Sequence, residues 1–445
     1  MPSSWAFEVR RREGADAVPP NPAETQKDRR SVTMTRLEFR RYGSTMRYFF
    51  WLVAWCSPVI GLSQETGSYP TPPRPAEGTV RIATFNAAMN RKTAGELTRA
   101  LESDDAQVRK IAAIIQCVGP DVLLLNEVDY AEPHAEMLLK KFLQVPQSGT
   151  PQDPSRHLQF AFSAPVNTGV PSGLDLNKNG RTEDPDDAWG YGAFPGQYGM
   201  VVLSRFPIQK TGLRTFQKFR WGDMPGALRP AKDSVFFHPD EVWKQLRLSS
   251  KSHWDVPIQI GNTTLHVLAC HPTPPVFDGP EDRNGCRNHD EIRLWIDYIS
   301  GDGRGDYLVD DSGARGGLDA NASFVILGDL NADPFDGDGK RDAIKQLLDH
   351  PRVAQGPVPS SKGAVEAAQK SGQANALHRG DSAYDTGDFN DKNPGNLRID
   401  FVLPSSQCRI LASGVYWPSA ADSPAGNQLA GASDHRLVWV DVELH

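Results

Sequence analysis

Several short apolar runs in this chain end in residues whose side chains can carry out chemistry. In Ser323–Pro334, SFVILGDLNADP, an apolar and partly β-branched run stops at a glycine, and Asp329 and Asn331 follow. Such a run predicts a buried strand that ends in a turn. A carboxylate and a carboxamide two residues apart can then face one pocket, one to ionise and one to hydrogen-bond. Because D-x-N is also common turn chemistry, the interpretation depends on the rest of the chain.

The same arrangement of strand and polar residue recurs elsewhere. Apolar runs predict strands over Val80–Phe85, Val122–Leu125 and Thr263–Cys270. The polar residues at these strands and near the last strand are Asn86, Asn126, Glu127, His271, Asp400, Ser433, Asp434 and His435. No G-x-S-x-G nucleophile motif and no Gly-rich nucleotide loop occurs in the sequence. Carboxylates, amides and imidazoles without a nucleophilic Ser or Cys suggest metal-assisted attack by water on a phosphoester.

Each residue also has an ordinary structural interpretation. Asn86 can cap a turn, and Glu127 can be a solvated edge carboxylate, although such a Glu is also a natural ligand for Mg²⁺ or Ca²⁺. His271 lies where a strand meets a Pro-containing loop, which suits a general acid or a structural histidine. In the adjacent pair Asp434 and His435, the first could hold a metal or water and the second a phosphate.

Hydrophobic periodicity predicts the elements that must position these residues. Amphipathic spacing predicts helices over 104–117, 288–299 and 340–348, and further strands are expected over 198–208 and near the end of the chain. Segments 144–197, 209–257 and 350–396 are interpreted as long loop insertions. The second of them is rich in Trp, Phe and basic residues, so it could line a substrate cleft or simply pack.

Composition limits the classes of function. The chain has 445 residues, of which 39% are hydrophobic, enough for a sizeable core. Its formal net charge is −7, and residues 1–63 contain ten Lys/Arg and six Asp/Glu, which leaves 38 basic and 49 acidic residues in the remainder. An acidic remainder argues weakly against gripping nucleic acid by bulk electrostatics, although a local basic groove stays open.

The N-terminal region is typical of a targeting segment. Arginines precede an apolar run over 48–62, and Gly61 and Ser63 are the small residues expected before a cut at Gln64. We therefore expect a signal peptide within 1–63 and export to a secreted, periplasmic or cell-surface location, with an uncleaved anchor as the alternative. After this segment we expect a linker over 64–78 and a single domain over 79–445.

Two further features concern cysteines and calcium. Beyond the signal region, four cysteines allow three disulfide pairings, and none has metal-ligand spacing. The segment DLNKNGRTEDPDD matches the opening of a calcium loop but lacks Glu at the twelfth position. An acidic surface turn is the alternative to a structural Ca²⁺, whose ligands would be Asp175, Asn177, Asn179, Glu183 and Asp186.

Taken in order, these residues resemble the endonuclease/exonuclease/phosphatase superfamily, which includes deoxyribonuclease I, abasic-site endonucleases, inositol-phosphate phosphatases and neutral sphingomyelinases. The motifs extend from Val80 to Leu444, and the G-D-x-N and S-D-H elements are specific in combination. The resemblance implies an α/β (α+β) fold, namely a four-layer α/β/β/α sandwich with two mostly antiparallel sheets and helices outside.

The resemblance also implies a metal site. Glu127 would ligate a divalent cation, Mg²⁺ or alternatively Mn²⁺ or Ca²⁺, with Asn86 and Asp434 near the metal or its water. Several relatives carry an Asp two residues after the first-strand Asn, and this chain has Ala88 there. The substitution leaves fewer carboxylates for a second metal.

Catalytic roles are implied in the same way. Asp329 would position or deprotonate the attacking water, while Asn331 and His435 would hold the phosphate. Asp400 would orient His435, and His271 would be the acid for the leaving group.

The sequence therefore predicts an exported, divalent-metal-dependent phosphoesterase that acts on a phosphodiester or a phosphomonoester. Within this class, an extracellular nuclease and a lipid phosphodiesterase of sphingomyelinase type stay open. The alternative from another class is a non-catalytic, calcium-stabilised binding module. We expect a monomer whose partner is the phosphoester substrate, with no stable protein partner.

Overall fold

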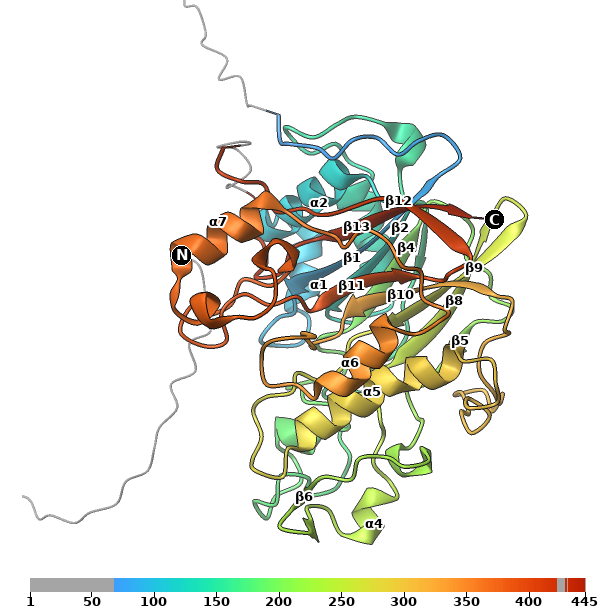
Figure 1. Ribbon diagram of the computed structural model, residues 1–445, viewed down its shortest axis with the longest axis vertical. Helices are drawn as coiled ribbons and strands as arrows, with labels where there is room; N and C mark the ends of the chain where they lie inside the picture. The colour runs from blue at the N-terminus through green and yellow to red at the C-terminus, as the bar shows by residue number, and fades with distance from the viewer. Residues whose placement is uncertain (1–67, 422–428, 430, 445) are drawn as a thin grey trace, which may run out of the picture. The chain divides into compact units, whose positions relative to one another are not determined.

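Two β-sheets form the centre of the computed structural model, which describes residues 68–421, 429 and 431–444. The first sheet contains, in chain order, β1 (Val80–Met89), β2 (Val122–Val128), β3 (Phe160–Phe162), β4 (Met200–Ser204), β12 (Cys408–Val415) and β13 (Val438–Leu444). The second contains β5 (Arg214–Thr215), β8 (His253–Ile260), β9 (Thr263–Cys270), β10 (Ser323–Asp329) and β11 (Asp400–Pro404). Figure 1 shows strands of both sheets in the middle of the fold and helices on the outside.

Strand order defines the topology. The first sheet has the order β12-β13-β1-β2-β4-β3 and the second β11-β10-β9-β8-β5. Only β1 with β2 and β9 with β10 pair in parallel among the strand pairs of the described chain; the other pairs are antiparallel. A separate small hairpin joins β6 (Ala231–Lys232) to β7 (Val235–Phe236). The predicted pair of mostly antiparallel sheets is confirmed.

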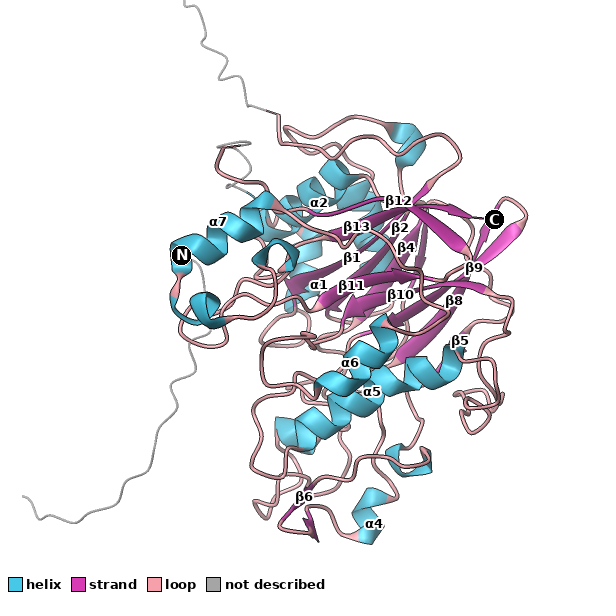
Figure 2. Cartoon of the chain, in the orientation of Figure 1, coloured by secondary structure: helices cyan, strands magenta, loops and turns pink. Residues whose placement is uncertain are grey.

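Helices complete the outer layers, as Figure 2 makes clear by separating helices from strands. They are α1 (Glu96–Glu102), α2 (Ala106–Val118), α3 (His134–Leu138), α4 (Asp240–Trp243), α5 (Arg283–Ile299), α6 (Arg341–Leu348) and α7 (Lys362–Ser371). Helix α2 was predicted to within two residues at each end. It begins after Asp105, whose side chain accepts a hydrogen bond from the Val108 amide. It ends at Gly119 in the left-handed conformation.

Three buried apolar clusters occupy the three interfaces of this four-layer arrangement. On β1, Ile82 faces the space between the sheets, whereas Ala83 and Phe85 face α1 and α2. On β10, Val325 faces between the sheets, whereas Phe324 packs on the α5 and α6 side. Alternation along each strand thus supplies both faces of each sheet, because successive side chains point to opposite sides. Both sheets are therefore covered on both faces.

A buried ion pair joins β1 to β13 within the first sheet. Arg81 donates from Nε and Nη2 to the two carboxylate oxygens of Asp441, at 2.7 and 2.8 Å. Its Nη1 also donates to the Val118 carbonyl at 2.8 Å, and its guanidinium lies over the Trp439 ring. This bidentate contact fixes the antiparallel register of two strands that are distant in sequence.

Several elements differ from the sequence prediction. The segments interpreted as loop insertions contain regular structure: β3 and β8 belong to the sheets, and α7 covers 362–371. In β8 the alternating Trp254, Val256 and Ile258 are buried between the sheets, but Pro257 and the polar loop before the strand obscured that pattern. Helix α5 begins at Arg283, five residues before the predicted start, because its first turns bury polar side chains that break apolar periodicity.

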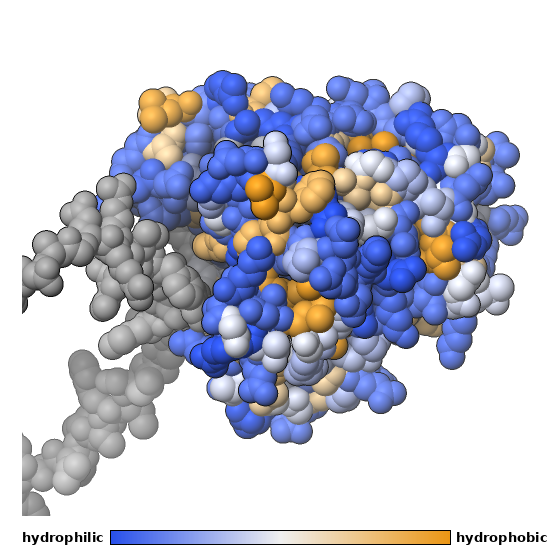
Figure 3. Space-filling model, turned by 90° about the horizontal axis from the view of Figure 1, so that it is seen from below, coloured by the Kyte–Doolittle hydropathy of each residue, from blue (hydrophilic) through white to orange (hydrophobic). Residues whose placement is uncertain are grey.

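The structure also bears on the predictions for the cysteines and the N-terminal segment. Cys117, Cys270, Cys286 and Cys408 are buried and unpaired, so no disulfide joins them. The predicted signal peptide lies outside the described residues. Within the described part of the chain, no helix has the length and apolar character needed to cross a membrane. One face of the protein, shown in Figure 3, is mainly hydrophilic with small hydrophobic areas.

Candidate active site

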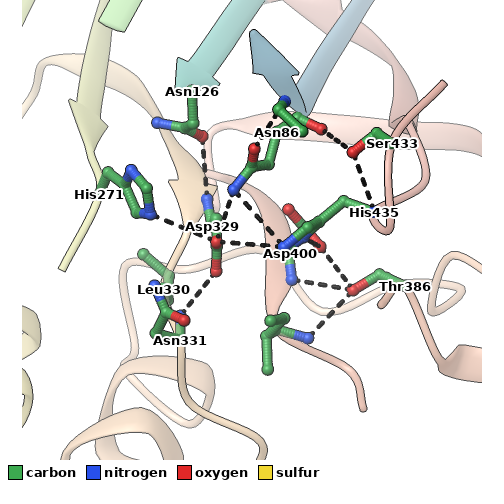
Figure 4. Close-up of polar contacts among 12 residues, drawn as sticks. Asn86, Asn126, His271, Asp329, Leu330, Asn331, Thr386, Asp400, Ser433 and His435 are labelled. Atoms are coloured by element: carbon green, nitrogen blue, oxygen red, sulfur yellow. Dashed lines mark hydrogen bonds and ion pairs between the residues drawn. The ribbon is translucent and has the colours of Figure 1, made fainter. Parts of the chain in front are cut away.

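The polar residues predicted at strand ends meet at one edge of the two sheets. Asn86 on β1 is paired in register with Asn126 on β2, and the regular β1–β2 pairing breaks directly after them. Asp329 ends β10, and it pairs with Asp400 at the start of β11. Because the sheets face each other, the first sheet's amides lie across from the second sheet's carboxylates (Figure 4).

The Asp329 carboxylate is the centre of this group. Asn86 Nδ2 donates to Asp329 Oδ2 at 3.1 Å. The same oxygen lies 3.4 Å from His271 Nε2 and 3.7 Å from His435 Nε2. Burial alone would raise the pKa of Asp329, but the His435 and His271 imidazoles hold it well below its usual range. Asp329 is therefore ionised at neutral pH and can accept a proton from water.

The backbone around Asp329 is also tightly held. Its amide donates to Asn126 Oδ1 at 3.1 Å, and its Oδ1 accepts from the Asn331 amide at 2.9 Å. Asn331 has a positive φ of 50°, and its side chain donates to the Pro272 carbonyl at 3.1 Å. This strained turn brings the predicted D-x-N pair to the site and connects it to the loop after His271.

A chain of hydrogen bonds extends from His435 away from Asp329. His435 Nδ1 lies 2.9 Å from Asp400 Oδ2, and the Thr386 hydroxyl donates to that same oxygen at 2.8 Å. Despite burial, the carboxylates of Asp400 and Asp329 raise the pKa of His435 well above its usual value. Burial raises the pKa of Asp400 to about 6. At pH 7, His435 is a cation between two ionised carboxylates.

His271 has the opposite electrostatic character. Burial, followed by repulsion from Lys251, lowers the pKa of His271 to about 4. Its Nδ1 has no hydrogen-bond partner among the described residues, so only Nε2 is engaged. The structure thus brings His271, the predicted acid for the leaving group, next to Asp329, where it is a neutral imidazole at pH 7. A proton donor role for it requires an anion nearby that raises its pKa.

The loop before β13 is attached to β1. The Ser433 hydroxyl donates to the Asn86 carbonyl at 2.8 Å and accepts from the His435 amide at 3.0 Å. The Phe389 ring meets the His435 ring edge to face, with centroids 5.4 Å apart. Ser433 therefore determines where the S-D-H segment places its histidine.

Glu127 is the carboxylate that best fits a divalent cation. It has a positive φ of 58°, so the backbone turns sharply at this residue. Burial, and then the neighbouring carboxylate of Asp434, raise the pKa of Glu127 to about 7. Asn86 contributes an amide oxygen nearby, which accepts from the Ala88 amide at 3.1 Å. Crowded oxygen donors of this kind are the ligands that Mg²⁺ and Ca²⁺ prefer, and a cation would relieve their mutual repulsion.

A second group, Asp329, Asp400 and His435, also has possible ligand atoms within 4.8 Å of one another. In that group, however, both ring nitrogens of His435 face carboxylates, at 2.9 and 3.7 Å. Because a protonated imidazole has no free lone pair for a metal, we interpret this group as a charge network rather than a metal site.

The predicted calcium loop folds as a tight turn. Asp175 accepts backbone hydrogen bonds from Asn179 and Gly180, and Asn177 also accepts from the Asn179 amide. No triplet of His, Cys, Asp or Glu ligand atoms gathers in this loop among the described residues. A structural Ca²⁺ held with Glu183 and Asp186 stays a prediction.

Sequence analysis named Asn126 and Ser433 among the polar residues near strand ends but assigned neither of them a role, and it missed Thr386. Thr386 lies in the segment interpreted as loose and polar, and only its proximity in space to Asp400 reveals it. Contacts between distant segments therefore identify these residues.

Comparisons with known proteins agree with this arrangement. The model of the Endonuclease/Exonuclease/phosphatase family matches residues 83–435. Comparison with curated proteins gives no significant match.

Solved structures similar in fold include an endonuclease/exonuclease/phosphatase from Beutenbergia cavernae, with 19% identity over 83% of this chain and 72% of that one, at a TM-score of 0.46. Sphingomyelinase C from Streptomyces griseocarneus has 14% identity over 82% and 99% of the two chains, at a TM-score of 0.41. Staphylococcus aureus beta toxin, solved with magnesium ions, has 13% identity over 81% and 99%, at a TM-score of 0.39.

Proposed function

Because the chain belongs to the endonuclease/exonuclease/phosphatase family, whose members are phosphoester hydrolases, we propose that it is an exported, divalent-metal-dependent phosphodiesterase. The observation that carries this proposal is the Asp329 carboxylate, which is buried, ionised and in contact with Asn86, His271 and His435. An ionised carboxylate in this position can orient the attacking water and accept its proton as the bond to phosphorus forms.

The catalytic steps follow from these residues. Asp329 takes a proton from water as the water oxygen forms a bond to phosphorus. The His435 cation and the Asn331 amide stabilise the negative charge that builds on the phosphate oxygens. As the bond to the leaving oxygen breaks, that oxygen needs a proton. A bound phosphate anion beside His271 favours its imidazolium form, which can then supply this proton.

The metal site is a separate part of the proposal. Glu127 would hold the cation, with Asn86 and Asp434 beside it. When bound, a divalent cation supplies electrostatic stabilisation of negative charge on the phosphate. Burial, and then the neighbouring carboxylate of Asp434, raise the pKa of Glu127, and this supports the assignment because a bound cation would stabilise the ionised carboxylate.

The direct test is hydrolysis of bis(p-nitrophenyl) phosphate and p-nitrophenyl phosphate by the full-length protein, with EDTA, Mg²⁺, Mn²⁺ or Ca²⁺. We expect metal-dependent cleavage of the diester that is lost in Asp329→Asn and His435→Ala, while both variants keep the wild-type far-UV circular dichroism. Unchanged turnover in both variants would contradict the proposal. Preference for the monoester would assign a phosphatase, and the binding-module alternative predicts no turnover of either ester.

Two natural substrate classes fall within this proposal, nucleic acid and phospholipid. Plasmid degradation on an agarose gel distinguishes a nuclease, and release of choline phosphate from sphingomyelin distinguishes a lipid phosphodiesterase. Export is tested by measuring the molecular mass of the protein recovered outside the cytoplasm. If the signal peptide is cut, this mass should be that of a chain that begins at Gln64.

A further inference from the structure

One lysine beside the candidate active site has no counter-charge in contact with it. The Lys251 side chain is 6% exposed and belongs to a fully buried stretch, Leu248–His253, that leads into β8. Lysine is rarely buried unless its ammonium is paired. The burial of the Lys251 side chain therefore needs an explanation.

Backbone contacts place Lys251 next to the loop that follows His271. Glu291 on α5 accepts from the Ser250 amide at 2.7 Å through Oε1 and from the Thr273 amide at 2.6 Å through Oε2. One carboxylate thus ties the residue before Lys251 to the second residue after His271. On the other side, the Asn167 amide donates to the Lys251 carbonyl at 2.9 Å.

The ammonium itself is unpaired. Among the described residues, none forms a hydrogen bond or an ion pair with its side chain. The charges that act on it are first Glu291 and then two active-site carboxylates, Glu127 and Asp329. It also repels a proton from His271. The Lys251 ammonium is therefore close enough to the catalytic group to act on a ligand bound there.

The structural alternative is that Lys251 serves only as the counter-ion of Glu291. However, both Glu291 oxygens already accept short hydrogen bonds from backbone amides, and the half-buried Arg287 lies nearby as a further positive charge. Glu291 therefore does not need the Lys251 ammonium as a second positive charge. An anionic ligand in the active site would instead give Lys251 the partner that the protein does not provide.

We propose that Lys251 binds a non-bridging oxygen of the substrate's phosphate group beside His271. This inference rests on the proposed phosphoesterase function and adds a binding residue to it. A fixed ammonium at this place attracts the phosphate and, once the anion is bound, shares its negative charge with His271. Such a residue favours substrates that present an unsubstituted phosphate oxygen on the His271 side of the site.

Equilibrium binding of inorganic phosphate tests the proposal without any turnover. Isothermal titration calorimetry would compare the full-length wild type, Lys251→Met and Lys110→Met, with Mg²⁺ in every sample. Lys110 is an exposed lysine on α2, so its variant controls for loss of one charge. We expect Lys251→Met to bind phosphate at least about tenfold more weakly, and Lys110→Met to bind it as the wild type does. An equal Kd in all three proteins, or no phosphate binding by the wild type, would overturn the proposal.

Thermal unfolding separates binding from a structural role. Replacing an unpaired buried ammonium by a Met of similar length should leave Tm unchanged or raise it. A lower Tm together with an unchanged phosphate Kd would instead identify Lys251 as the counter-ion of Glu291. If Lys251→Met does not fold, the ¹⁵N resonance of the Lys251 ammonium in the wild type gives a second test: it should shift as phosphate saturates the site, and an unchanged resonance would refute the contact.

The outcome is independent of the turnover assay. If phosphate binding needs Lys251 but the protein cleaves neither ester, the phosphate contact of Lys251 is supported and the proposed function is refuted. If the protein cleaves the diester but Lys251→Met leaves the phosphate Kd unchanged, the proposed function is supported and the phosphate contact of Lys251 is refuted.

Discussion

The side-chain amide of Asn126 holds the backbone of Asp329 across the gap between the two sheets. Asn126 Oδ1 accepts a hydrogen bond from the Asp329 amide at 3.1 Å. Its Nδ2 donates to the Cys270 carbonyl at 3.2 Å, so one residue of β2 fixes the ends of both β9 and β10. The position of the proposed general base in the second sheet therefore depends on an amide in the first.

Asn126→Ala should reduce both stability and turnover. The substitution leaves a buried amide and a buried carbonyl without partners, which costs about 2 kcal/mol of the free energy of unfolding. Displacement of Asp329 should lower kcat by about ten- to a hundredfold with little change in KM. Urea unfolding and steady-state kinetics would measure the two effects.

The matched control for this variant is Gln116→Ala. Gln116 clamps the 142–150 loop through several hydrogen bonds away from the site. The Gln116→Ala variant should lower the free energy of unfolding and leave kcat unchanged. A wild-type kcat in Asn126→Ala would show that Asp329 keeps its position without the amide.

Thr386→Val should shift the pH profile. The Thr386 hydroxyl donates to Asp400 Oδ2 and accepts from the Asp400 amide at 3.0 Å. Losing this donor destabilises the ionised carboxylate, so the pKa of Asp400 should rise above its present value of about 6. Because the ionised form pairs with His435, the acidic limb of the kcat profile should move to higher pH, and kcat at pH 7 should fall about tenfold. Thr386→Ser keeps the hydroxyl and should retain the wild-type profile; an identical shift in both variants would rule out this explanation.

Glu127→Gln should remove Mg²⁺ binding. In the wild type, Mg²⁺ at a hundred times its Kd should stabilise the folded state by about 2.7 kcal/mol, and EDTA should reverse this. The variant keeps the side-chain size but loses the charge, so calorimetric Mg²⁺ affinity should drop at least about a hundredfold. Glu136→Gln, at an exposed glutamate on α3, provides the control. Full Mg²⁺ stabilisation in Glu127→Gln would place the ion elsewhere.

Asp385→Asn should change how stability depends on pH. Burial, and then the carboxylates of Asp333, Asp336 and Asp381, raise the pKa of Asp385 to about 8, against about 4 in an unfolded chain. Between these values the folded state binds a proton that the unfolded state does not, so the free energy of unfolding falls as pH rises. The slope is up to about 1.4 kcal/mol per pH unit.

Thermal unfolding between pH 5 and 9 measures this slope. Asp385→Asn should flatten it and raise Tm above pH 8, because no charge is then forced into the buried site. Asp338→Asn, at an exposed carboxylate, should keep the wild-type slope. An equally steep curve in Asp385→Asn would assign the effect to other groups.

Local sequence was sufficient to locate the central strands but not all of their ends. The run before Asp329 and the run before Glu127 are apolar and short, so each strand and the carboxylate near its end could be located, although β2 continues past Glu127 to Val128 and β1 continues past the predicted end to Met89. The predicted strand Thr263–Cys270 has the same bounds in the structure as in the sequence interpretation. In these places, backbone preference and burial pattern agree.

Contacts between segments could not be predicted in the same way. Nothing near Asn126 in the sequence indicates that β9 and β10 lie opposite it, and Thr386 meets Asp400 only because a polar segment folds over the start of β11. Lys251 lies in a segment interpreted as cleft wall or packing, where its unpaired ammonium could not be foreseen. Polar residues buried in α5, such as Asn288 and Glu291, resemble surface residues until their hydrogen-bond partners are known.

The pairing of β1 with β13 has a consequence for the timing of folding. Arg81 and Asp441, which join these two strands, are separated by 360 positions in the chain. During synthesis, β1 has no antiparallel neighbour until nearly all of the described chain has left the ribosome. His435 arrives only just before β13, so a partly made chain has Asp329, the proposed general base, but lacks the cation that faces it. Activity should therefore appear only once β13 has been made, and fragments that stop before β13 should be inactive.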